Sequence, residues 1–319
     1  MKKQTKIWLI SAAVLIVLGI MLFNAAMTVN HWDFSKISTI NYQTNTYTFN
    51  KAFHNIEIKT DTADILFLPS EDGICKVVCH EKDTALHDVL VQDKTLIVKV
   101  IPVKDWVQIG ISSESPKITV YLPETEYASL LIRENTGDIE IPKGFHFQSM
   151  DITTSTGDVK NYASASEDIR IKTNTGDILT ENISAKNLSF SVSTGKITAE
   201  SVICKETLEI NVSTGKTNLT DISCKNLISN GTTGDIFLIN LLASEKIFIE
   251  RSTGDINFDG CDANEIQIKT STGDVEGTFL SDKSFDTETD TGKISVPKGT
   301  NGGKCEIVTD TGDIKINIK

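Results

Sequence analysis

The chain has 319 residues, of which 39% are hydrophobic and 23% are charged, so it can bury a sizeable core and shows no sign of disorder. Its formal net charge of -12 argues against a nucleic-acid partner, because binding to phosphates needs a basic surface that this chain lacks. The acidity is consistent with plain solubility and leaves cationic partners open.

The N-terminal segment is predicted to cross a membrane. Ile7–Phe23 contains no charged residue, and we predict a transmembrane helix over 7–27, long enough for about 30 Å of hydrocarbon. Lys2, Lys3 and Lys6 precede the run, and no Lys or Arg follows before Lys36. By the positive-inside rule, residues 1–6 form a cytoplasmic tail and the rest of the chain lies outside the cytoplasm.

A cleaved signal peptide is the alternative for this segment. The apolar run is long for that role, and cleavage after Ala25 or Ala26 would place Phe23 or Asn24 where a small residue is required. We therefore favour a retained anchor in the cell membrane.

Residues 28–48 are predicted to be a juxtamembrane connector. In residues 49–129 we expect a degenerate first coil, Phe53–Pro69, with Ala63 in the place of a turn glycine. It is followed by alternating segments at Lys76–His80, Thr95–Ile101, Trp106–Ile111 and Lys117–Leu122. We interpret these segments as an antiparallel β cap, because an uncapped solenoid end exposes unpaired strand edges.

Residues 130–319 carry ten copies of a Thr-Gly-Asp or Thr-Gly-Lys tripeptide at intervals of 19 or 20 residues. A fixed period of this length is typical of a solenoid. The turn glycines are Gly137, Gly157, Gly176, Gly195, Gly215, Gly234, Gly254, Gly273, Gly292 and Gly312.

Apolar residues alternate on both sides of each tripeptide. The fifth residue before the glycine is apolar in eight of ten copies, with Ser229 and Thr287 as exceptions, and the second residue after it is Ile or Val in all but Thr217. This period of two indicates half-buried strands on either side of a glycine turn. One coil cannot bury its own apolar face, so the coils must stack.

The fold class is therefore all-β: a single-stacked β-solenoid with 19 to 20 residues per coil, an N-terminal antiparallel cap and one transmembrane helix. The last coil, in which Ile314, Ile316 and Ile318 alternate with polar residues, is expected at the free end. There Lys315 and Lys319 would guard against end-to-end association.

The chain resembles a family of bacterial β-strand-repeat domains and candidate adhesins whose function is not known. The shared features are Phe-x-x-Ile-x-Ile at Phe53–Ile58, Ile-x-Val-x-Leu-Pro at Ile118–Pro123, and the run of Thr-Gly-Asp-Ile repeats. The resemblance implies a membrane-tethered cell-envelope protein, in some members associated with envelope stress, and supplies no catalytic residues. Lys196, Lys216 and Lys293 depart from the pattern at the Asp position.

The Asp that follows most turn glycines should form a ladder along the solenoid. Stacked carboxylates attract Ca²⁺, so cation binding is one interpretation. The other is a solvated ladder relieved by the interspersed lysines, which we favour because Ca²⁺-binding β-rolls have a nine-residue period. The ladder consists of Asp138, Asp158, Asp177, Asp235, Asp255, Asp274 and Asp313.

Two groups of cysteines need an explanation. Cys204 and Cys224 each lie nine residues after a turn glycine, so they should be neighbours in adjacent coils, either as a disulfide or as reduced apolar side chains. Cys75 and Cys79 lie near His80 and His87, but no second pair completes a zinc set, so we interpret them as buried packing.

No cofactor site or catalytic triad stands out from the sequence. Arg251, with Asp235, Asp255 and Lys216 on nearby coils, is the one constellation that resembles a polysaccharide-cleaving β-helix. We therefore predict a non-enzymatic binding, adhesin-like or scaffolding surface with envelope glycans or other envelope proteins as partners. The alternatives are a polysaccharide-active enzyme and a partner of a membrane signalling system.

Overall fold

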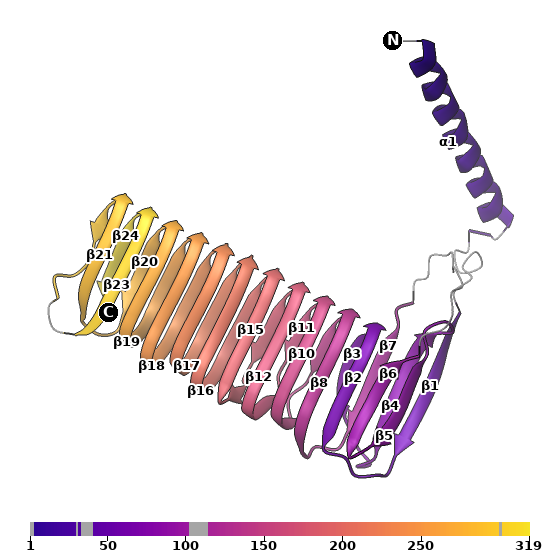
Figure 1. The fold of residues 1–319 in the computed structure, drawn as a ribbon, viewed down its shortest axis with the longest axis horizontal. Coiled ribbons are helices and arrows are strands. Elements are labelled where there is room, and N and C mark those ends of the chain that lie inside the picture. Colours follow the sequence, from indigo (N-terminus) through magenta and orange to yellow (C-terminus); the bar gives the residue numbers. More distant parts are fainter. Residues whose placement is uncertain (1–2, 30, 33–40, 102–113, 300–301) are drawn as a thin grey trace.

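The computed structural model describes residues 3–29, 31–32, 41–101, 114–299 and 302–319. Helix α1, Lys3–Val29, includes the predicted span 7–27. Within Gln4–Val29, an 18-residue window has a mean hydropathy of 2.5, and no residue of that window is buried against another part of the protein (Figure 1). The helix is thus long and apolar enough to cross a membrane.

The remaining elements form a β-solenoid, as predicted (Figure 1). Each coil has a first side that ends at Thr-Gly, a short second side after the turn, and a third side that leads into the next coil. Neighbouring coils pair in parallel and almost in register, apart from bulges where the third side meets the next first side. The early coils comprise β8 (Glu126–Thr136), β9 (Ile139–Ile141), β10 (His146–Thr156), β11 (Val159–Asn161), β12 (Ser164–Thr175), β13 (Ile178–Glu181), β14 (Ser184–Ala185) and β15 (Asn187–Thr194).

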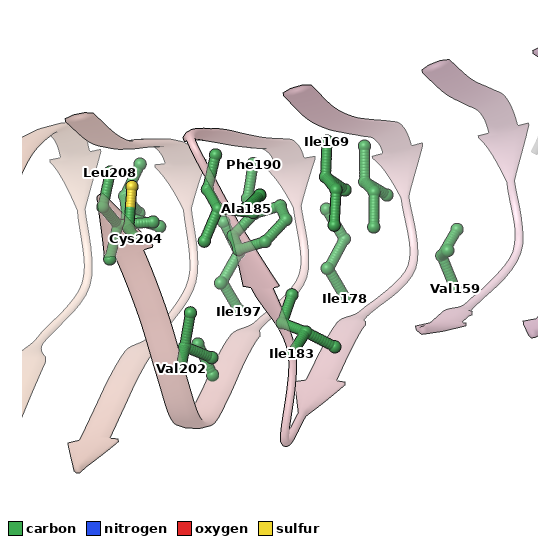
Figure 2. Close-up of a cluster of buried hydrophobic side chains, with 14 of the residues drawn as sticks. Val159, Ile169, Ile178, Ile183, Ala185, Phe190, Ile197, Val202, Cys204 and Leu208 are labelled. Atoms are coloured by element: carbon green, nitrogen blue, oxygen red, sulfur yellow. The ribbon is translucent and has the colours of Figure 1, made fainter. Parts of the chain in front are cut away.

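In the central coils one continuous strand runs from each Thr-Gly turn to the next. These strands are β16 (Ile197–Thr214), β17 (Thr217–Thr233), β18 (Ile236–Thr253) and β19 (Ile256–Thr272). Inward side chains from successive coils form a continuous core, and Figure 2 shows Ile169, Phe190 and Leu208 pointing into it from three neighbouring coils. Each coil therefore covers the apolar face of its neighbour, which is what holds a solenoid together.

Glycine is required at the turn for two reasons. At Gly157 the backbone φ is 142°, a conformation that residues with a Cβ rarely adopt. A Cβ built there would lie 1.9 Å from the carbonyl oxygen of Gly137 in the neighbouring coil. At Gly157 the two coils thus approach too closely for a side chain.

The coil has a second corner that the sequence analysis did not predict. Six residues after the glycine, five coils have a residue with left-handed φ between 50° and 65°. Short polar side chains and glycine tolerate this conformation better than other residues do. The residues at this corner are Asn182, Ser201, Asp221, Asn240 and Gly260.

The predicted first coil is confirmed. Strands β2 (Asn55–Thr62) and β3 (Asp64–Pro69) run parallel to β8 and β9, with Thr62 opposite Thr136. Ala63 occupies the place of the turn glycine, since its N–H donates to the Thr136 carbonyl at 3.1 Å.

The cap is antiparallel, as predicted, but only in part. Strand β4 (Cys75–Lys82) pairs antiparallel with β7 (Lys117–Leu122), and β5 (His87–Gln92) pairs antiparallel with β6 (Thr95–Val100). However, β6 and β7 also run parallel to β2 and β3, so they form a further coil outside the first one. The predicted segment Trp106–Ile111 lies outside the described residues.

The boundary between the connector and the cap also differs from the prediction. Strand β1 (Tyr42–Phe49) pairs antiparallel with β4. It lies almost wholly within residues 28–48, which were predicted to be the connector, so the cap begins at Tyr42.

The order of the last coils corrects the expectation that the final coil lies at the free end. Strand β23 (Gly303–Thr311) pairs with β19 on one side and with β21 (Lys283–Thr291) on the other. Likewise, β24 (Ile314–Ile318) lies between β20 (Val275–Phe279) and β22 (Ile294–Ser295). The final coil, β23 and β24, therefore lies between the coil of β19 and β20 and the coil of β21 and β22 (Figure 1). Its lysines are not at the end of the solenoid.

This insertion can be tested with engineered disulfides. Gln267 and Glu306 are register partners, as are Asp286 and Glu306, whereas Gln267 and Asp286 lie two coils apart, about 9.6 Å at 4.8 Å per strand. We expect Gln267→Cys/Glu306→Cys to form a disulfide under mild oxidation and the matched Gln267→Cys/Asp286→Cys variant not to form one. Non-reducing electrophoresis of proteolytic fragments reads out both, and the opposite pattern would establish sequential stacking.

Candidate binding surface

The Asp ladder lies along the glycine edge and has a structural role. The Asp158 N–H donates to Asp138 Oδ1 at 2.8 Å, and the Asp177 N–H donates to Asp158 Oδ1 at 2.8 Å. Each carboxylate thus accepts the backbone N–H of the next coil, which would otherwise face solvent without a protein partner. The same contact recurs at Asp235, Asp255, Asp274 and Asp313, whose Oδ1 atoms accept from the next coil at 2.7 to 3.2 Å.

The position of Lys293 in the outermost coil explains why an Asp is not needed there. Lys293 donates its N–H to Asp313 Oδ1 at 2.8 Å and belongs to the outermost coil, where no described strand beyond it needs an acceptor. Within the stack, Lys216 pairs through Nζ with Asp235 Oδ2 at 3.4 Å. The favoured interpretation of a solvated ladder agrees with these contacts, and cation binding stays a hypothesis.

The ladder predicts different effects for three substitutions. Asp158→Ala removes an acceptor from the Asp177 N–H and should lower the free energy of unfolding by about 1 kcal/mol. Asp158→Asn retains an oxygen acceptor and Lys293→Ala removes none, so both should stay within about 0.5 kcal/mol of wild type in urea unfolding. A rise in Tm with millimolar Ca²⁺ that Asp158→Asn abolishes would instead favour cation ligation.

The predicted pair Cys204 and Cys224 are register partners in β16 and β17. Both thiols are buried and free in the structure. Burial raises the pKa of Cys204 to about 11 and that of Cys224 to about 12, so both stay protonated at neutral pH. The reduced alternative is the one that the structure contains.

A buried polar network in the cap joins four strands. His87 Nδ1 lies 2.7 Å from Glu81 Oε2, and His87 Nε2 lies 2.8 Å from Thr60 Oγ1. Glu81 also accepts from Asn45 Nδ2 at 2.7 Å. Cys79, Glu81 and His87 could together offer three metal ligands, and Glu81 is the member that the sequence analysis missed. These hydrogen bonds connect β1, β2, β4 and β5.

His80, which the sequence placed near this group, belongs to the outer surface of β4. Its ring stacks on Tyr42 and its Nε2 lies 3.0 Å from Glu114 Oε2. Cys75 is buried on the opposite face of the strand, as predicted for packing.

The constellation proposed for an enzyme does not assemble. Arg251 is only 2% exposed and points into the solenoid interior, where its Nη2 donates to Thr217 and Ser229. Asp255 is exposed at the glycine edge and donates its N–H to Asp235, which pairs with Lys216. The interpretation of these four residues as a polysaccharide-cleaving site is therefore wrong.

Glu134 is a buried carboxyl group at the junction of the cap and the repeats. Burial raises its pKa to about 8; an N–H bond from Ala63 opposes this shift, and the charges of Asp64 and Asp138 add to it. Its second oxygen, Oε2, has no hydrogen-bond partner. The carboxyl group is therefore held largely protonated at neutral pH.

This raised pKa makes stability depend on pH. Between the ordinary value of 4.5 and about 8, the unfolded chain releases this proton while the folded chain retains it, so the free energy of unfolding falls as pH rises. Glu134→Gln should remove this loss and be more stable than wild type by on the order of 2 kcal/mol at pH 8, and nearly equal to it at pH 4.5. Urea unfolding at both pH values checks this, with exposed Glu140→Gln as the control.

Two surface grooves lie at the corner where the third side meets the next first side. One has a volume of about 510 Å³ and the other about 500 Å³. Small side chains at this corner leave the surface concave; they include Ser164, Ala165, Ser184, Ser223, Cys224, Ala243 and Ala263. Ile203 and Leu242, on the same side of the coils, are 56% and 48% exposed. Hydroxyl groups beside exposed apolar side chains suit an extended partner.

These features define a class of protein: a β-solenoid of repeated coils joined to an N-terminal helix that is able to span a membrane. Residues 53–317 match the Toastrack DUF4097 family, and the chain belongs to it. A comparison with curated proteins finds no match.

Several solved structures are similar to the chain at low identity. A candidate adhesin from Bacteroides fragilis has 15% identity and a TM-score of 0.39, covering 86% of this chain and 97% of its own. A candidate lipid-binding protein from Parabacteroides distasonis has 17% identity and a TM-score of 0.47, covering 88% and 98%. A candidate cell adhesion protein from Clostridium sporogenes has 12% identity and a TM-score of 0.24, covering 88% and 100%.

Proposed function

We propose that this protein is a single-pass membrane protein whose extracytoplasmic solenoid serves as a non-enzymatic, adhesin-like binding or scaffolding surface at the cell envelope. The observation that carries the proposal is the pairing of an exposed apolar helix with a rod of stacked coils. Such a rod offers long flanks to extended partners, and the corner grooves run along one of them. Envelope glycans and other envelope proteins are the partners we propose.

The orientation can be tested by thiol labelling in intact cells. All six native cysteines are buried, so a membrane-impermeant maleimide should react mainly with introduced ones. Lys172→Cys, on the exposed surface of β12, should be labelled in intact cells, whereas Gln4→Cys should react only after lysis. The reverse pattern would place the solenoid in the cytoplasm, and a chain shortened by the length of α1 would indicate a cleaved signal peptide.

The binding surface can be tested on the full chain in nanodiscs with purified cell-wall glycans, acidic polysaccharides and envelope extract. Filling the groove with Ser223→Arg should weaken binding at least tenfold, because the added side chain occupies the corner. Ser191→Arg, on the first side of β15 and outside both grooves, should change it less than twofold. Equal affinities for the two variants would exclude the grooves, and new reducing ends in the glycans would contradict a non-enzymatic role.

A further inference from the structure

Three side chains that are able to bind a metal ion converge inside the cap. Cys79 Sγ, a carboxylate oxygen of Glu81 and a ring nitrogen of His87 all lie within 4.8 Å of one another. The three residues are 0%, 1% and 4% exposed. The structure therefore brings a thiol, a carboxylate and an imidazole to one point away from solvent, which a search of the sequence for a second Cys or His pair does not detect.

The strands of the cap determine this arrangement. Cys79 and Glu81 alternate with polar residues on the buried face of β4. His87 begins β5, and its N–H donates to Glu81 Oε2 at 2.7 Å. Strand β4 pairs with β1 and β7, whereas β5 pairs with β6. An ion held by all three side chains would therefore join two parts of the cap.

The separations of the three atoms are close to those of a zinc site. Ligand atoms around tetrahedral Zn²⁺ lie about 3.3 to 3.6 Å apart, given Zn–N, Zn–O and Zn–S bonds of about 2.0 to 2.3 Å. His87 Nδ1 lies 2.7 Å from Glu81 Oε2, and replacing the proton between them by an ion would part them by about 0.6 Å. The Cys79 Sγ would move by at most about 1.2 Å, because it already lies within 4.8 Å of both other atoms.

The outer hydrogen bonds of the cluster suit a metal site as well. His87 Nε2 lies 2.8 Å from Thr60 Oγ1, so it can donate its proton to this hydroxyl while Nδ1 binds an ion. Asn45 Nδ2 donates to Glu81 Oε1 at 2.7 Å and leaves Oε2 directed at His87. Partners of this kind fix the tautomer of a ligating histidine and the orientation of a ligating carboxylate.

The charges of the cluster match a divalent ion. Burial, with the charge of Glu81 adding to it, raises the pKa of Cys79 to about 12, so without an ion the thiol keeps its proton at neutral pH. Its Sγ makes no hydrogen bond within the described part of the chain, whereas the thiols of Cys204 and Cys261 donate to backbone carbonyls. An incoming Zn²⁺ displaces the thiol proton to solvent. One thiolate and one carboxylate then balance its two positive charges, as a buried position requires.

We propose that the cap binds one zinc ion through Cys79 Sγ, Glu81 Oε2 and His87 Nδ1. A water molecule completes the tetrahedron. A thiolate and an imidazole favour zinc over Ca²⁺ and Mg²⁺, which prefer oxygen ligands. The ion links β4 to β5 and stabilises the cap. This site is separate from the corner grooves, because none of the three ligands lines either groove.

The test uses the full chain in detergent, produced in medium with zinc or cobalt so that the ion is present while the cap folds, and washed with excess Ca²⁺ to clear surface carboxylates. We expect one zinc ion per chain and, with Co²⁺, a thiolate-to-cobalt charge-transfer band. X-ray absorption at the zinc edge should show one sulfur at about 2.3 Å. Two sulfurs would assign the metal to Cys204 and Cys224, and no sulfur would assign it to surface carboxylates; either result would overturn the proposal.

Two cysteine variants assign the ion to this cluster. Cys79→Ser should abolish the charge-transfer band, whereas Cys75→Ser should retain it. Cys75 is a matched control, because it is buried on the same face of β4 and lies outside the cluster. Equal bands in the two variants would contradict the proposal. A wild-type chain that keeps no zinc would do so as well, even if neither variant folds.

Discussion

The structure depends on the close approach of coils at the Thr-Gly edge. At nine of the ten turns the glycine N–H donates to a threonine carbonyl of the neighbouring coil, for example from Gly137 to Thr156 at 2.9 Å. A Cβ at a turn glycine would come within about 2 Å of a backbone carbonyl oxygen in the neighbouring coil, so glycine is required in the coil that approaches this carbonyl. The coil that supplies the carbonyl tolerates a Cβ, as Ala63 does opposite Gly137. This contact fixes the register, and the register aligns the inward columns and the carboxylates that accept the next N–H groups. Because this backbone contact recurs once in each coil, it sets the period at which Thr-Gly repeats in the sequence.

The period of the Thr-Gly repeats made much of the fold predictable. Alternation around each glycine identified the inward positions, and equal spacing from the glycines placed Cys204 beside Cys224. The order of the last coils could not be predicted in this way, because β21 and β23 carry equivalent repeats and either can pair with β19. The inserted strand is accommodated by close backbone contacts on both sides. Gly303 lies against the Asn264 carbonyl and Gly302 against the Asp282 carbonyl, and a Cβ would not fit at either position. Such contacts join distant residues and leave no periodic signal.

The candidate sites show the same limit. Ser229 and Thr217 are visible in the sequence as exceptions to an apolar pattern, and Arg251 is visible as a charge at an inward position. Taken singly, each is an irregularity that a repeat tolerates. Only the stacking shows that Thr217 and Ser229, which lie 34 and 22 residues before Arg251, both accept hydrogen bonds from its guanidinium. In the cap, Glu81 was missed because it lies in a strand without a repeat, and its partners Asn45 and His87 come from two other strands.

The two ends of the solenoid limit where a partner can bind. Near the N-terminus, the antiparallel pairs β4–β7 and β5–β6 cover strand edges that would otherwise be open. At the other end, β21 pairs on one side only among the described strands, and its exposed residues Asp286, Glu288 and Asp290 repel another acidic strand. Negative charge at an open edge disfavours the addition of further copies of this acidic chain. The binding surface that we propose therefore lies on the flanks, where small side chains make the corner concave and leave apolar groups exposed.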